Sequence, residues 1–154
     1  MITETVTNQA AEHITAAPEL YRTTKILIID HPGSGSDTLV WAIESLGDIV
    51  QICHDIDYVV DQARQYMPDV IILDLPTVGS DAPRLCRALH QIKGVSCAKI
   101  IGQGTSSAAS AMGDDVASQY DLHLRKPIDL IVLNDMLALL RVSPKAPAKA
   151  SEHT

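Results

Sequence analysis

Short, strongly apolar runs alternate along the chain with longer amphipathic stretches. The runs are rich in β-branched residues and apolar on both faces, which is typical of strands buried inside a parallel sheet. This pattern predicts strands over residues 25–30, 48–55, 69–75, 98–102 and 121–125. The intervening stretches carry apolar residues at helical spacing and predict helices over residues 36–47, 57–67, 81–92, 107–120 and 129–142.

A strand followed by a helix therefore occurs five times. Strands that are apolar on both faces need helices on both faces of the sheet. Right-handed crossovers then give a doubly wound α/β fold, a flavodoxin-like (βα)5 three-layer sandwich with a five-stranded parallel sheet. We expect the strand order 2-1-3-4-5, with function outside the C-terminal strand ends, where the order reverses.

The length of 154 residues suggests one domain. Hydrophobic residues make up 46% of the chain and aromatic residues only 3%, so the core must be aliphatic. We expect residues 1–23 to form a flexible polar lead and residues 24–142 the folded domain. Residues 143–154, rich in proline, alanine and lysine, are expected to be a disordered tail.

Charge and cysteine content narrow the classes of partner. A net charge of −7 argues against nucleic acid, whose phosphates need clustered Lys and Arg. The first residues lack the apolar core of a signal peptide, and no apolar stretch is long enough for a membrane span. The three cysteines, Cys53, Cys86 and Cys97, have no close spacing. We expect reduced thiols in the cytoplasm, packed as small core residues.

Candidate chemistry gathers at the C-terminal ends of the predicted strands. Asp30 ends the first strand, Asp74 ends the third, and Lys126 and Pro127 follow the fifth. In the order 2-1-3-4-5 the first and third strands are neighbours, so the two aspartates would lie within reach of one another. Two close carboxylates favour a hard divalent cation between them. Lys126 could supply a movable positive charge for a phosphoryl oxygen.

At these residues the chain resembles the receiver domains of two-component response regulators. The resemblance covers about residues 24–142, and its motifs are "LIIDH" with Asp30, "VIILDL" with Asp74 and "LHLRKP" with Lys126. The spacing from Asp74 to Lys126 also fits the family. The resemblance implies a stand-alone phosphoryl-accepting switch rather than an independent enzyme, with at most self-phosphotransfer and self-dephosphorylation.

The resemblance also implies a role for each residue. Asp74 would accept a phosphoryl group from a phosphohistidine on a histidine kinase or phosphotransfer protein. Asp30, Asp74 and the backbone carbonyl of Pro76 would hold Mg²⁺, which neutralises charge during phosphoryl transfer. Lys126 would pair with the phosphoryl oxygens. A downstream protein target would then recognise the modified state.

Several positions depart from the family. The second of two adjacent acids after the first strand is replaced by His31, which should weaken Mg²⁺ binding unless the imidazole is itself a ligand. The hydroxyl position after the fourth strand falls on Gly104, with Thr105 next to it, and the aromatic switch position holds His123. These departures leave open a pseudo-receiver, a phosphorylation-independent binding or adaptor module with the same fold.

A nucleotide-binding loop is a third interpretation of the glycines after the first strand. Gly33 and Gly35 begin a Gly-x-Gly-x-x-Gly pattern, but the third position is Thr38. This interpretation also leaves Asp74 and Lys126 without a function. We therefore expect the glycines to let the chain leave an acidic pocket and enter the first helix.

The last predicted helix is apolar nearly all round. A helix of this kind buries more than one face. We expect its excess apolar surface, together with the fourth helix and the fifth strand, to form a homodimer or partner interface. The residues are Leu130, Ile131, Val132, Leu133, Met136, Leu137, Leu139 and Leu140.

Overall fold

Five parallel strands form the centre of the molecule. The structure is a computed structural model that describes residues 23–105 and 120–142. The strands are β1 (Lys25–Ile29), β2 (Ile49–Cys53), β3 (Val70–Asp74), β4 (Lys99–Gly104) and β5 (Leu122–Arg125). They form one sheet in the order β2-β1-β3-β4-β5, and every neighbouring pair is parallel. The predicted fold and strand order are confirmed.

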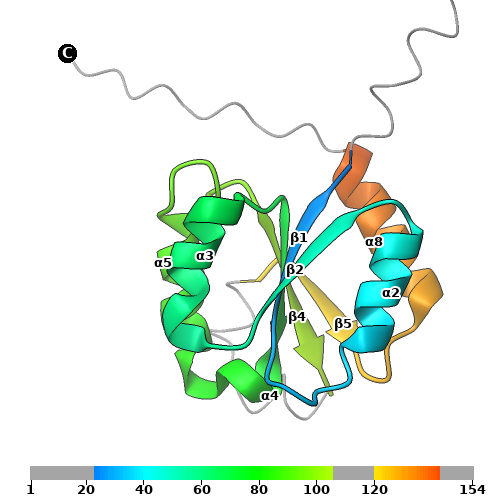
Figure 1. Cartoon of the computed structure of the whole chain (residues 1–154), viewed down its shortest axis with the longest axis horizontal. Coiled ribbons are helices and arrows are strands. Elements are labelled where there is room, and N and C mark those ends of the chain that lie inside the picture. The colour runs from blue at the N-terminus through cyan, green and yellow to red at the C-terminus, as the bar shows by residue number, and fades with distance from the viewer. Residues whose placement is uncertain (1–22, 106–119, 143–154) are drawn as a thin grey trace, which may run out of the picture.

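Helices cover both faces of this sheet. They are α2 (Asp37–Ser45), α3 (Val59–Tyr66), α4 (Leu75–Val78), α5 (Ala82–His90) and α8 (Leu130–Val142). Two 3₁₀ turns, Ile56–Tyr58 and Gly79–Asp81, precede α3 and α5. Figure 1 shows α3 and α5 on one side of the strands and α2 and α8 on the other. Most of the predicted helix over residues 107–120, nearly all of the lead over residues 1–23 and the tail lie outside the described residues.

The central strands explain why their sequences are continuously apolar. In β1, Ile26 and Ile28 pack with the residues of α2 and α8. The alternate residues Leu27 and Ile29 pack with those of α3 and α5. Successive side chains of a strand point to opposite faces, so a strand between two helical layers needs apolar residues at every position. All five residues of β3 are likewise buried.

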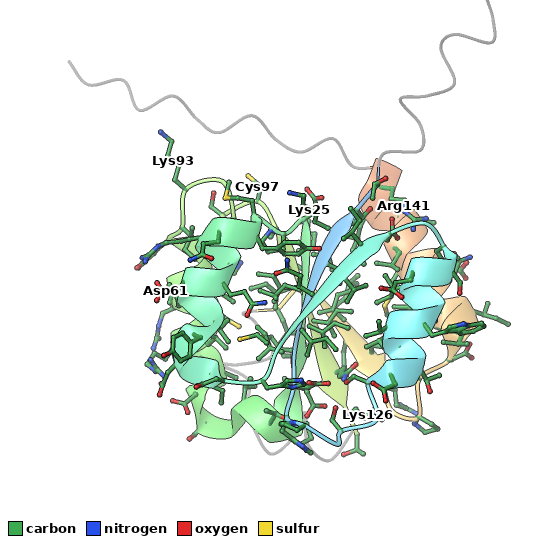
Figure 2. The ribbon with its side chains drawn as sticks, viewed as in Figure 1. Lys25, Asp61, Lys93, Cys97, Lys126 and Arg141 are labelled. Carbon is green, nitrogen blue, oxygen red and sulfur yellow. The ribbon has the colours of Figure 1, made fainter. Side chains whose placement is uncertain are left out.

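The last helix is fixed at the sheet by packing and by charge. Leu133 and Leu137 of α8 are 1% and 0% exposed and belong to the cluster on this side of the sheet. Near its C-terminal end, Arg141 donates to the buried carboxylate of Asp48, which also accepts from the Thr24 amide at 3.0 Å. Figure 2 shows Arg141 at the end of the molecule opposite Lys126.

Other apolar residues of α8 remain exposed, as the all-round pattern predicted. The exposed fractions are 41% for Leu130, 73% for Ile131, 41% for Val132 and 68% for Leu139.

No helix in the described part of the chain has both the length and the apolarity needed to cross a membrane.

The segment after β3 forms a short helix that the sequence pattern did not predict. It forms α4, because Asp74 occupies the N-cap position and its side chain accepts a hydrogen bond from the Thr77 amide. Pro76 lies in the first turn, where its missing N–H has no cost. Strand β4 is also longer than predicted and continues to Gly104.

The prediction that all three cysteines lie in the core is wrong for one of them. Cys53 and Cys86 are buried, but Cys97 is exposed. It lies in the run of turns between α5 and β4, and connections of this kind run over the surface. Figure 2 shows Cys97 near Lys93, at the end of the molecule opposite Lys126.

Two leucines of α8 give a matched test of this packing. Replacing Leu137 by Ala should lower the free energy of unfolding by about 2–5 kcal/mol, because it opens a cavity in the core. Leu139→Ala changes a side chain that is 68% exposed, so its effect should stay within about 0.5 kcal/mol. Urea denaturation of both variants checks this, and equal losses would contradict the placement of α8.

Candidate functional site

Three buried polar side chains lie at the C-terminal edge of neighbouring strands. Ile29 of β1 pairs with Leu73 of β3, so Asp30 and Asp74 come next in register. Asp74 is in turn the register partner of Gln103 in β4. Adjacent strands lie about 4.8 Å apart. Each of the three side chains is 1% exposed, and buried polar and charged groups require partners.

Asp74 has partners for both carboxylate oxygens. Its Oδ1 accepts from Lys126 Nζ and from Gln103 Nε2, the latter at 3.4 Å. Its Oδ2 accepts from the Thr77 amide at 3.2 Å and from the Thr77 hydroxyl. The carboxylate therefore links β3 to β4, to α4 and to the residue that follows β5.

Lys126 reaches this carboxylate because its backbone continues the pairing of the last two strands. The Lys126 amide donates to the Gly104 carbonyl at 3.1 Å, one position beyond the end of β5. The peptide bond between Lys126 and Pro127 is cis. Figure 2 shows Lys126 at the end of the molecule opposite Lys25, Lys93 and Cys97.

These contacts set the ionisation state of Asp74. Burial disfavours the charged carboxylate, but the hydrogen bonds from Lys126 and Thr77 and the positive charge of Lys126 outweigh it. The pKa of Asp74 consequently lies below its ordinary value of 3.8. Asp74 is an ionised, desolvated carboxylate at neutral pH.

The glycine-serine loop after β1 wraps around the carboxylate of Asp30. Asp30 Oδ2 accepts hydrogen bonds from the hydroxyl groups of Ser34, at 2.6 Å, and Ser36. Gly33 and Gly35 have φ values of 84° and 82°, which favour glycine and allow the loop to fold back. The loop therefore belongs to an acidic pocket, as the sequence led us to expect.

The hydroxyl of Ser36 is used for this pocket and not for the helix. Ser36 occupies the N-cap position of α2, but its side chain makes no capping hydrogen bond. Its only described hydroxyl contacts are Asp30 and Ser34. The strand-end acid thus organises the start of α2.

The other oxygen of Asp30 faces an imidazole from β2's C-terminal end. His54 Nδ1 lies 3.1 Å from Asp30 Oδ1. The hydrogen bond of this nitrogen is formed with the main-chain oxygen of Asp30, at 3.2 Å. Oδ1 is buried and has no hydrogen bond from the described residues. A buried carboxylate oxygen without a donor is suited to a cation.

The predicted metal ligands are brought together only in part. Asp30 and Asp74 fit Mg²⁺, since this ion is often held by one or two carboxylates and several waters. His31 is exposed, and its Nδ1 lies 2.8 Å from the Pro32 carbonyl oxygen, away from Asp30. Among residues 23–105 and 120–142, no group of three or more His, Cys, Asp or Glu side chains could hold a metal ion.

The ligand role of the Pro76 carbonyl stays a prediction. Pro76 is exposed and lies in the first turn of α4, directly after the N-cap residue Asp74 and Leu75.

Two of the predicted switch positions, Gly104 and His123, contact each other across the last two strands. Gly104 has no side chain, and its carbonyl accepts from the Lys126 amide and contacts His123 Nε2 at 3.3 Å. Thr105 is exposed. His123 packs edge-on against the ring of Tyr120, with ring centroids 6.2 Å apart.

Several site residues were not predicted. These are Ser34, Ser36, His54, Thr77 and Gln103. A sequence signal existed for two of them: the Asp-x-Pro start of α4, which places Thr77 as a capping partner, and the single polar side chain, Gln103, near the end of an apolar strand. The contact of His54 depends on strand pairing and has no local signal.

Comparisons with known proteins support the fold. No protein-family model and no curated protein matches the chain. Solved structures do. The receiver domain of a sensor histidine kinase of Pseudomonas aeruginosa, with magnesium in its active site cleft, has a TM-score of 0.69 at 18% identity, covering 79% of this chain and 100% of that chain.

Two further structures agree. The chemotaxis response regulator CheY4 of Vibrio cholerae has a TM-score of 0.62 at 18% identity, covering 77% of this chain and 99% of its own. A response regulator receiver domain of Bermanella marisrubri has a TM-score of 0.66 at 22% identity, covering 77% and 98%. The chain has the fold of receiver domains, and the predicted resemblance is confirmed at the level of the fold.

The Asp74–Lys126 pair predicts a specific response to mutation. Replacing Lys126 by Gln should raise the pKa of Asp74, because burial raises this pKa and the hydrogen bond and charge of Lys126 counteract that effect. An NMR titration of the Asp74 carboxyl carbon measures this. Lys93→Gln, at an exposed lysine at the opposite end of the molecule, should leave the pKa low. An unchanged pKa in Lys126→Gln would contradict the pairing.

The same shift fixes the sign of the pH dependence of stability. In the wild type the pKa of Asp74 in the folded state is depressed. The stabilisation from ionised Asp74 is therefore fully present above the ordinary pKa of 3.8. That contribution is lost as the pH falls through the folded pKa. In Lys126→Gln the folded pKa should move upward, so this loss of stability on acidification should begin at a higher pH and be smaller.

Proposed function

We propose that this chain is a phosphoacceptor signalling module of the receiver type, with Asp74 as the residue that is phosphorylated. The observation that carries the proposal is the buried, ionised carboxylate of Asp74, held by Lys126 at the strand edge next to Asp30. A desolvated carboxylate beside a lysine and a second acid is suited to accept a phosphoryl group. The receiver fold of the chain supports this assignment.

The reaction follows from the roles of these groups. An oxygen of Asp74 attacks phosphorus, the phosphorus–nitrogen bond of the donor phosphohistidine breaks, and the imidazole leaves with the bonding electrons. Lys126 follows the transferred group and pairs with its oxygens, a role suited to an ammonium on a flexible stem. Mg²⁺ held by Asp30 and Asp74 would neutralise charge on the transferring group.

We propose two partners for this site. One is a histidine kinase or phosphotransfer protein that donates the phosphoryl group, and the other is a downstream protein target that recognises the phosphorylated state. Beyond self-phosphotransfer and self-dephosphorylation, we propose no enzymatic activity. None of the three cysteines forms a disulfide bond with another, which is compatible with a reducing compartment. We propose the cytoplasm.

Direct phosphorylation tests the proposal. Incubation with acetyl phosphate and Mg²⁺ should raise the intact mass of the protein by one phosphoryl group. Asp74→Asn should abolish this increase, because the carboxylate nucleophile is lost. Asp61→Asn, which alters an exposed carboxylate paired with Arg64 on α3, should retain it. An increase that persists in Asp74→Asn would refute the assignment of Asp74.

A pseudo-receiver is the second candidate function. The observation in its favour is that both oxygens of Asp74 already have donors within the unmodified chain. The absence of a hydroxyl at Gly104 and the position of His31 point the same way. For this candidate, neither acetyl phosphate nor phosphoramidate, a donor with a phosphorus–nitrogen bond, forms an adduct in the presence of Mg²⁺.

We propose further that α8 forms a homodimer interface. The exposed leucine, isoleucine and valine side chains of this helix are the reason, because exposed apolar patches of this kind mark association surfaces. Sedimentation velocity should show dimers that dissociate on dilution, and Ile131→Asp should shift the protein to monomer. Tyr58→Asp, at a 63% exposed residue next to α3, should not. A wild-type protein that is monomeric at high concentration would exclude this interface.

A further inference from the structure

Gln103 is a buried polar side chain in the part of β4 where the preceding three residues are apolar or glycine. It is 1% exposed and follows Ile100, Ile101 and Gly102 in β4. Burial of an amide lowers stability unless its hydrogen bonds are made. An apolar residue would fill the same space without that cost. The amide therefore calls for an explanation in terms of what it contacts.

The contact is the carboxylate of Asp74. Gln103 Nε2 lies 3.4 Å from Asp74 Oδ1, the oxygen that also accepts from Lys126. The reverse orientation of the amide would bring two oxygens together, so the nitrogen is the atom that faces the carboxylate. Gln103 in β4 and Lys126, the residue after β5, thus approach one atom.

The oxygen of the Gln103 amide has no hydrogen-bond partner among the described residues. This atom, Oε1, is buried. A glutamine with a purely structural role would have both ends of its amide satisfied. Here the unmodified site satisfies one end, and that end lies at the distance limit of a hydrogen bond. The amide has capacity left for a group that is not part of the chain.

We propose that Gln103 contacts the phosphoryl group transferred to Asp74, as the side chain that compensates for the missing hydroxyl at Gly104. This inference rests on the proposed function. The amide N–H donates to a phosphoryl oxygen where negative charge develops, and the residue neither gives nor takes a proton. When Lys126 leaves Asp74 Oδ1 for the phosphoryl oxygens, Gln103 Oε1 accepts a hydrogen bond from one of the three N–H groups of Lys126.

The step itself is balanced with acetyl phosphate as donor. An oxygen of Asp74 attacks phosphorus, the bond from phosphorus to the bridging oxygen breaks, and acetate leaves with the electron pair. Gln103 contributes hydrogen bonds only. Its removal should therefore slow the chemical step and leave binding of the donor unchanged.

Gln103→Met tests this because methionine has a similar length and lacks the amide. The rate constant of phosphorylation at saturating acetyl phosphate, followed by intact mass, should fall by about tenfold. The half-saturating concentration of acetyl phosphate should not change. Gln91→Met, at an exposed glutamine after α5, should behave as the wild type. Gln103→Glu, which keeps the size but loses the donor, should be at least as slow as Gln103→Met.

The outcomes separate this inference from the function on which it rests. If the wild type forms no Asp74-dependent adduct, the proposed function fails and the role of Gln103 fails with it. If the wild type is phosphorylated and Gln103→Met or Gln103→Glu reacts at the same rate, only the role of Gln103 is refuted. Urea denaturation shows whether each variant is folded, so a slow reaction caused by unfolding can be recognised. If one variant does not fold, the rate of the other decides.

Discussion

The carboxylate of Asp74 lies at the end of the central strand β3 with almost no access to water, and it is charged. A buried charge is tolerated only when an opposite charge and hydrogen bonds replace its hydration. Lys126 supplies that charge from 52 residues further along the chain. The ion pair therefore requires β3, β4 and β5 to be assembled in order. The charged state of the Asp74 carboxylate thus depends on the correct fold.

Both strand-end acids also organise the segment that follows them. Asp74 Oδ2 caps α4 through Thr77, and Asp30 Oδ2 holds the loop before α2 through Ser34 and Ser36. A group attached to Asp74 would change the charge and the acceptors available to Thr77 and to Lys126. The contacts that stabilise the unmodified site are thus the ones through which a modification would reach α4 and the end of β5.

The sequence was sufficient for the fold and for the acids because both depend on local pattern. Continuous apolar runs identify strands that are buried on both faces, and an acid at the end of such a run lies at the sheet edge. It was insufficient where the outcome depends on competition between contacts. The sequence predicted no helix between Asp74 and residue 81, but the Asp74 carboxylate accepts a hydrogen bond from the Thr77 amide and begins a short helix. Gln103 and His54 acquire their partners only through strand register.

The replacement of the second acid at the first strand changes the balance of charge in the pocket. His31 points to the surface, and the imidazole nearest to Asp30 is that of His54, from the edge strand. Two carboxylates then face one lysine and one imidazole, and a divalent ion must compete with Lys126 for Asp74. A third carboxylate would have increased the attraction for the ion without adding a competing cation. The pocket is therefore expected to hold Mg²⁺ less tightly than a site with three acids, and to depend more on neutral donors such as Thr77 and Gln103 to stabilise negative charge on Asp74.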